Sequence, residues 1–292
     1  MRALLALALL AAPLAAQSSV TTGRALAPGG AVRLVIPHGR VQLTTWDRDS
    51  VAIRGRLDTS AGTLTLEGSR DSLRVGLARP ATARGVGQAD LEITVPREAR
   101  VTFTGLSAEF DCEAGGGEVT ATTTSGRLRV TGTARVSVLE TLDGNVELAV
   151  QGRTARLRTA TGTIVARGLV EELDASSVSG PLLIGMEGAV RSARLESTSA
   201  AISFKGDLRP DGRLVVETHG GDVDLRLRPS LEATWAIANW GGVLENTLLP
   251  PAQVTRGAHK GEWAFVTGRG GARVEVRTFK GTVRLEPRPQ ER

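Results

Sequence analysis

The residues that could carry chemistry in this 292-residue chain are few and scattered. The only histidines are His38, His219 and His259, and the first two each precede a glycine at an expected turn. The chain has no His-Glu-x-x-His pair, no Gly-x-Ser-x-Gly nucleophile turn and no phosphate-binding loop. We therefore interpret the histidines as solvated turn residues rather than as general bases.

Glu196, Glu217, Asp222 and Asp224 come closest to an acidic cluster. Paired carboxylates cleave glycosidic bonds, so one hypothesis is a carbohydrate-active enzyme that uses these residues. The outward positions around them, however, mix both signs of charge, which is typical of a solvated face with weak ion pairs. These positions are Thr122, Glu140, Arg158, Ser176, Glu196 and Glu217. No catalytic residue is therefore assigned.

Metal and thiol chemistry have little support in the sequence. The segment 220–224, Gly-Gly-Asp-Val-Asp, resembles a calcium-binding repeat turn, but it occurs once, and such sites need several consecutive turns. Cys112 is the only cysteine, so no intrachain disulfide can form. Its phase in the repeat described below places it on the core side, where we expect it to be buried and inert. We expect no metal and no cofactor.

The N-terminus predicts export. Residues 1–16 have the form of a secretory signal: Arg2, an apolar run over 3–12, and a small-residue exit over 13–16. The apolar run is too short to span a bilayer comfortably, and no later stretch approaches eighteen apolar residues. We expect the mature chain in the periplasm, on the cell surface or outside the cell, without a transmembrane segment.

The charge does not indicate a nucleic-acid partner, although the net charge is +5 and the pI is near 10.4. Arginine is interleaved with Asp and Glu, no run of Lys and Arg reaches five, and aromatic residues make up only 3%. Nucleic-acid binding needs a concentrated basic surface and, for single strands, aromatic stacking platforms.

A repeat of 18–21 residues dominates the rest of the chain. Each unit has Thr, Ser or, in two units, Ala as its origin, a glycine three residues later, and apolar residues four and two before and five and seven after. The origins are Thr123, Thr141, Thr159, Ser177, Ser197, Thr218, Ala238, Ala258 and Thr278. The exceptions are Ala200 at the glycine position and Ser137, Thr234, Glu245 and Arg256 at apolar positions.

Alternation of period two indicates strands with one buried face, and the glycine marks a corner where a positive φ is expected. A unit this short cannot bury its apolar face alone, so the units must stack. The sequence predicts an all-β fold: a single-stranded β-solenoid of about ten coils over 101–287, an imperfect first unit included. An antiparallel meander is the alternative. Leu128, Val146, Ile164 and Leu182 should then be neighbours on one inner wall.

The flanking segments differ from the repeat. Residues 17–100 are rich in expected strands but do not follow the 18–21-residue repeat. We therefore expect them to form an N-terminal β cap over the edge of the stack, which would otherwise invite aggregation. Its expected strands are 32–36, 39–43, 51–53, 63–66, 73–75 and 91–95. Residues 288–292 form a charged, proline-bearing tail that suits an edge blocker.

Three features together resemble a known family: GRVQLTTWDRD at 39–49, LEITVP at 91–96, and the serial Thr/Ser-x-Ser/Asp/Thr-Gly-x-apolar units. The chain resembles, over most of 30–287, secreted bacterial β-strand-repeat domains of unknown function that are often named candidate adhesins. The resemblance implies a β-solenoid-like fold on an exported protein and no established activity, cofactor or catalytic residue. The chain departs from that pattern because Asp rarely follows the glycine; Asp222 is the main instance.

The leading functional hypothesis is a non-catalytic exported protein, an adhesin or a structural or interaction surface of the envelope. The alternatives are a carbohydrate-active enzyme on a β-helix scaffold and a regulatory binding module of the cell envelope. A surface glycan or an envelope protein is the expected partner.

Overall fold

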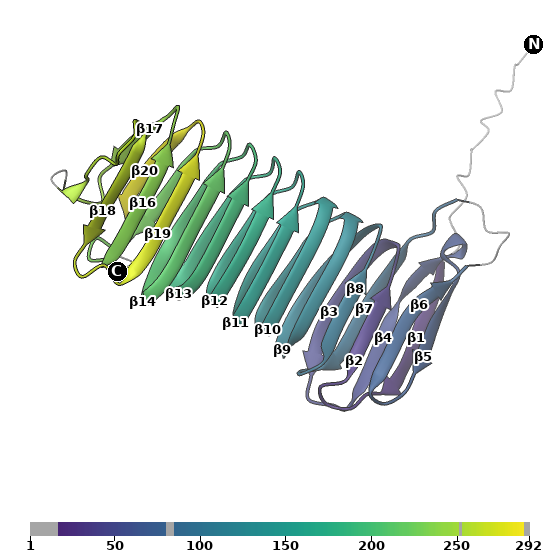
Figure 1. The fold of residues 1–292 in the computed structure, drawn as a ribbon. Helices are drawn as coiled ribbons and strands as arrows, with labels where there is room; N and C mark the ends of the chain where they lie inside the picture. Colours follow the sequence, from purple (N-terminus) through teal and green to yellow (C-terminus); the bar gives the residue numbers. More distant parts are fainter. Residues whose placement is uncertain (1–16, 80–84, 251–252, 289–292) are drawn as a thin grey trace, which may run out of the picture.

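The computed structural model describes residues 17–79, 85–250 and 253–288, and it confirms the all-β class. Twenty strands join in one sheet, and a short 3-10 turn, η1 (Thr59–Ala61), lies between β4 and β5. Figure 1 shows the strands stacked along one long axis, with β1–β8 at one end and β16–β18 at the other. The predicted signal over 1–16 lies outside the described residues, as do residues 289–292 of the tail. No helix in the described ranges has the length and apolar character needed to cross a bilayer.

The middle of the chain forms six long strands, which we call the parallel stack. They are β9 (Ser107–Ser125), β10 (Leu128–Asp143), β11 (Val146–Thr159), β12 (Ile164–Ser177), β13 (Leu182–Ser197) and β14 (Ile202–Thr218). Each pairs in parallel with the next, offset by one repeat. Leu128 lies opposite Val146, Val146 opposite Ile164, and Ile164 opposite Leu182, all fully buried. The inner wall is confirmed, and the antiparallel meander is excluded for these strands.

Each long strand contributes to two faces. In β9 the first part pairs with β3 and the last part with β8, so one strand spans both faces. The first face holds the apolar residues that follow each glycine corner, and the second holds those that precede each Thr or Ser. Alternation buries Val, Leu, Ile and Ala between the faces, and Phe103 stacks on Phe110 with ring centroids 4.6 Å apart. Cys112 is buried in this core, as predicted.

The N-terminal strands extend both faces and then turn antiparallel. They are β1 (Gln17–Ala25), β2 (Ala31–Val35), β3 (His38–Trp46), β4 (Ser50–Asp58), β5 (Thr63–Gly68), β6 (Ser72–Ala78), β7 (Ala89–Pro96) and β8 (Arg100–Thr104). The first face continues β9–β3–β7–β4–β1, and the second continues β9–β8–β2–β6–β5. All six predicted strands are present. The antiparallel strands β4, β1 and β5 lie at this end of the stack.

The C-terminal strands do not follow chain order. They are β15 (Val223–Leu227), β16 (Ala233–Asn239), β17 (Val243–Asn246), β18 (Glu262–Thr267), β19 (Ala272–Thr278) and β20 (Thr282–Pro287). β19 lies between β14 and β16, and β20 lies between β15 and β17. We call β19 and β20 the inserted coil. The prediction that units stack in sequence order is therefore wrong at this end.

Two predicted units also require correction. The residue opposite Thr278 is Asn239, not Ala238, so this coil is shifted by one residue. The shift makes Trp235 and Ile237 the inward residues, both buried, and removes the exception at Thr234. Asn246, opposite Leu285, takes the place of Glu245 as the polar exception. The unit at Ala258 is no coil, because β18 runs antiparallel to β16. An antiparallel strand also alternates with period two, so the pattern could not distinguish the two arrangements.

The corner glycines are needed mainly because neighbouring coils approach closely. The expected positive φ occurs at Gly126 (125°) and Gly281 (112°) but not at Gly144, Gly162, Gly180 or Gly221. At the latter four, a methyl group would overlap the backbone carbonyl oxygen of the coil before. The prediction of a positive φ at every corner is therefore wrong.

The facing of β11 can be tested by one pair of variants. Val146→Asp places a charge at a fully buried position and should lower the free energy of unfolding by at least about 3 kcal/mol. Glu147→Lys, one residue along and facing solvent, should cost under about 1 kcal/mol, mainly through its ion pair with Arg129 at 3.8 Å. Equal losses in urea unfolding would contradict the assigned faces.

The crowding at the corner gives a second test. Gly144→Ala should destabilise the protein by about 1–3 kcal/mol, because the new methyl group meets the carbonyl of Gly126 although φ is permissive. Ala200→Gly, at the one corner that already accepts a methyl group, should cost no more than about 1 kcal/mol through backbone entropy. Thermal unfolding of both variants measures the difference, and a neutral Gly144→Ala would argue against the close approach.

Candidate functional site

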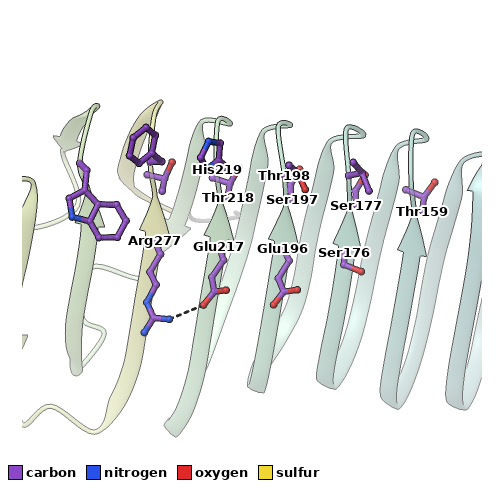
Figure 2. A pocket seen from close by; sticks show the side chains of 14 residues that line it. Thr159, Ser176, Ser177, Glu196, Ser197, Thr198, Glu217, Thr218, His219 and Arg277 are labelled. Atoms are coloured by element: carbon purple, nitrogen blue, oxygen red, sulfur yellow. Dashed lines mark hydrogen bonds and ion pairs between the residues drawn. The ribbon is translucent and has the colours of Figure 1, made fainter.

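A groove of about 570 Å³ crosses successive coils where they turn between the two faces. Figure 2 shows its side chains coming from consecutive strands, with Glu196, Glu217 and Arg277 in line below a row of Ser and Thr residues. The groove reaches from Thr159 to Trp240 and follows the long axis of the stack. Its position is set by the repeat, because each coil presents the same turn at the same place.

The turn is built by the Thr or Ser at the repeat origin. The hydroxyls of Thr159, Ser177, Ser197 and Thr218 each accept a hydrogen bond from the backbone N–H three residues later, at 2.8–3.1 Å. This side-chain contact satisfies a donor that the corner would otherwise leave unpaired. At Thr123 and Thr278 the hydroxyl instead donates to the carbonyl two residues later, and these are the coils whose glycine has a positive φ.

The residue after each origin points outward and forms a row that we call the turn strip. It consists of Leu142, Ala160, Val178, Thr198, His219, Phe279 and Trp240, and backbone hydrogen bonds between neighbouring turns fix this order. Four of them are large exposed apolar side chains: Leu142, Val178, Phe279 and Trp240, at 46–59% exposure. The rings of His219 and Phe279 stack in parallel with centroids 5.1 Å apart.

The carboxylates beside the strip are ion-paired. Glu217 accepts a hydrogen bond from Arg277 at 3.1 Å, and Glu196 accepts one from Arg194. Arg194 also lies 3.9 Å from Glu217. A general base needs a free lone pair near the substrate, and a guanidinium partner occupies such a lone pair. The geometry therefore gives these residues a structural use.

The four predicted acidic residues do not converge. Glu196 and Glu217 precede the turn on the second face, whereas Asp222 and Asp224 follow it on the first face. There Arg284 lies 3.1 Å from both Asp222 and Asp224, and Glu245 also binds it at 3.1 Å. In the segment 220–224, which resembles a calcium-binding turn, both carboxylates therefore bind the guanidinium group of Arg284. Over the described ranges, no cluster of three or more His, Cys, Asp or Glu is arranged to hold a metal ion.

The remaining candidate residues lie apart. Burial, followed by the nearby charges of Asp111 and Glu113, raises the pKa of the Cys112 thiol to about 12, which disfavours the thiolate. His38 begins β3 and is half-buried, while His259 is exposed in the turn before β18. Only His219 belongs to the groove. Its stacking partner Phe279 is 60 positions away in the sequence, so nothing local could have revealed the pair.

The contact between Asp222 and the inserted coil predicts a pH dependence. The backbone N–H of Thr282, and then Arg284, lower the pKa of Asp222 below its usual value. Asp222 therefore stabilises the fold at neutral pH, and this contribution disappears as the pH falls through the lowered pKa. Asp222→Ala should lower the melting temperature at pH 7 more than at acid pH, when the carboxylate is protonated in both states.

Glu245→Ala is the matched control, because Glu245 binds the same arginine but is more exposed. Its loss should shift the melting temperature less than the loss of Asp222. An equal effect of Asp222→Ala at pH 7 and at acid pH would contradict the assigned contact.

Comparisons with known proteins give similarity to solved structures only. No protein-family model and no curated protein matches the chain. A candidate adhesin from Parabacteroides merdae is 11% identical with a TM-score of 0.48, and covers 91% of this chain and 95% of its own. A candidate adhesin from Parabacteroides distasonis is 12% identical with a TM-score of 0.47, covering 92% and 97%. A candidate lipid-binding protein from the same organism is 9% identical with a TM-score of 0.42, covering 92% and 96%.

Proposed function

We propose that this chain is an exported, non-catalytic β-solenoid protein that presents the turn strip and its groove as a binding surface, in the manner of an adhesin. In this proposal residues 1–16 are a signal peptide that is removed, and 17–100 form a cap. Residues 101–287 form the solenoid, and 288–292 form a tail that blocks the edge. The partner is a glycan or a protein of the cell envelope or of a neighbouring surface.

The turn strip is the observation that carries the proposal. Single exposed apolar residues are ordinary, but several large ones gathered along one face mark an interaction site. Leu142, Val178, Phe279 and Trp240 are all at least 46% exposed along one row, in which Thr198 and His219 separate Val178 from Phe279. Val178, Phe279 and Trp240 also line the groove. Tryptophan is also the side chain that most often dominates binding energy.

The solenoid assignment is supported by the parallel register of β9–β14, in which every strand is offset from its neighbour by one repeat. Such a stack is rigid because each rung is hydrogen-bonded on both sides. A rigid row of side chains loses little conformational entropy on binding, which favours affinity for an extended partner.

The arrangement of carboxylates favours binding over catalysis. A carbohydrate-active enzyme would need two carboxylates that converge on one bond, whereas Glu196 and Glu217 are each held by an arginine. A regulatory module of the cell envelope would use the same surface and differ only in its partner. Turnover of a glycan or ester panel by the mature chain, abolished by Glu217→Gln, would overturn the non-catalytic proposal.

The binding surface can be tested with residues 17–292 on an array of immobilised glycans and envelope proteins. Trp240→Ser should weaken binding to the best ligand by at least about tenfold, since it removes a large exposed anchor. Leu183→Ser is the matched control, because Leu183 is 46% exposed but lies on a strand outside the strip. Binding that is equally weakened by both variants, or by neither, would place the site elsewhere.

A further inference from the structure

The turn strip ends in a basic pocket at the C-terminal end of the stack. Trp240 lines both the groove and a second pocket of about 380 Å³, which is formed by the turn before β18. Arg256, His259 and Lys260 line this second pocket, and Glu262 is its carboxylate. Lys280 follows Phe279 directly and is exposed at the same end of the strip.

These cations differ from those along the stack. Arg194, Arg277 and Arg284 are each bound to one or more carboxylates. Within the part of the chain that the structure describes, no ion pair joins Arg256, Lys260 or Lys280 to an acidic side chain. The strip therefore runs from a charge-compensated middle to an end with excess positive charge.

We infer that the turn strip and this pocket bind a linear polysaccharide that carries carboxylate groups, lying along the long axis of the stack. The inference rests on the proposed function and names its ligand class. Sugar rings lie along the apolar row, and a carboxylate of the polymer meets Arg256 and Lys260 beside Trp240. The hydroxyls of Ser176 and Thr198 line the groove and face the sugar hydroxyls.

The length and width of the turn strip suit an extended polymer. From Leu142 to Trp240 the strip crosses six intervals between coils, which is about 29 Å at the usual spacing of strands. It is one residue wide and open, so it suits a thin extended chain better than a compact ligand. A pyranose ring offers an apolar face to an aromatic or aliphatic side chain and a rim of hydroxyls to polar ones.

The charges argue against the other anionic partners. A nucleic acid places a phosphate at every nucleotide, and Glu196 and Glu217 flank the strip where those phosphates would lie. A bilayer needs a broad apolar face, and this strip is bordered by charged side chains on its second-face side. A chain of sugars with spaced carboxylates meets neither obstacle.

The test compares hyaluronate, which carries a carboxylate on every second sugar, with the same polymer after full methyl esterification, using residues 17–292 and isothermal titration calorimetry. Hyaluronate should bind at least about tenfold more tightly, and the difference should shrink at high salt. The double variant R256Q/K260Q should lose about fivefold or more for hyaluronate and nothing for the ester. Trp240→Ala should weaken binding of both polymers.

Arg153→Gln is the matched control, because Arg153 is exposed within β11, where the strand passes from the first face to the second and away from the turn strip. It should leave both affinities unchanged, and the melting temperature of every variant should stay near that of the parent. If the acid and the ester bind equally, and both need Trp240, the inference that the ligand carries carboxylates is wrong. The proposed function is then unaffected. Binding to phosphatidylglycerol vesicles but to neither polymer would overturn the inference that the ligand is a polysaccharide. No binding by the parent to these polymers or to the array would overturn both proposals.

Discussion

The hydrogen bonding of each coil to the next is the constraint on which the rest of the structure depends. Because parallel strands pair residue for residue along each face, equivalent positions of neighbouring coils lie on top of one another at about 4.8 Å, apart from bulges at the bend in β12 and β13. Columns of like residues follow from this: Leu128, Val146, Ile164 and Leu182 inside, and the hydroxyl residues at the turns. The same spacing leaves no room for a methyl group at Gly144 or Gly162, so close approach explains these glycines.

The sequence predicted the features that every coil shares, such as which residues point inward. It did not predict the order in which the coils stack. Alternation predicted the inward residues of β9–β14 because it depends only on the local geometry of a strand. It could not reveal that β19 enters between β14 and β16, since inserted and sequential coils carry the same pattern. Asn239 was missed for a related reason: it replaces the hydroxyl residue at a corner, and its amide donates to Gly281 across the insertion.

The candidate site was even less predictable. His219, Phe279 and Trp240 become neighbours only because the inserted coil carries Phe279 between the other two. For the acidic residues, spacing along the chain predicted which side chains face outward but not which arginines they bind. Glu217 and Asp222 proved to bind arginines of the inserted coil, Arg277 and Arg284. Arg213 with Glu275 and Arg226 with Glu286 add two more pairs between the same coils. Each exposed pair contributes little stability, but together they match one register of insertion and oppose others.

The inserted coil also has a consequence for the order in which the molecule can be made. A chain that is synthesised from its N-terminus can add β9 to β14 one after another, each on a finished template. β16 and β17 emerge before β19 and β20, yet their partners on the inner side are strands that do not yet exist. Assembly of this end must therefore wait for residues 272–287, and a chain that stops before them leaves an open seam next to β14. The stack can thus close only after β19 and β20 have been made.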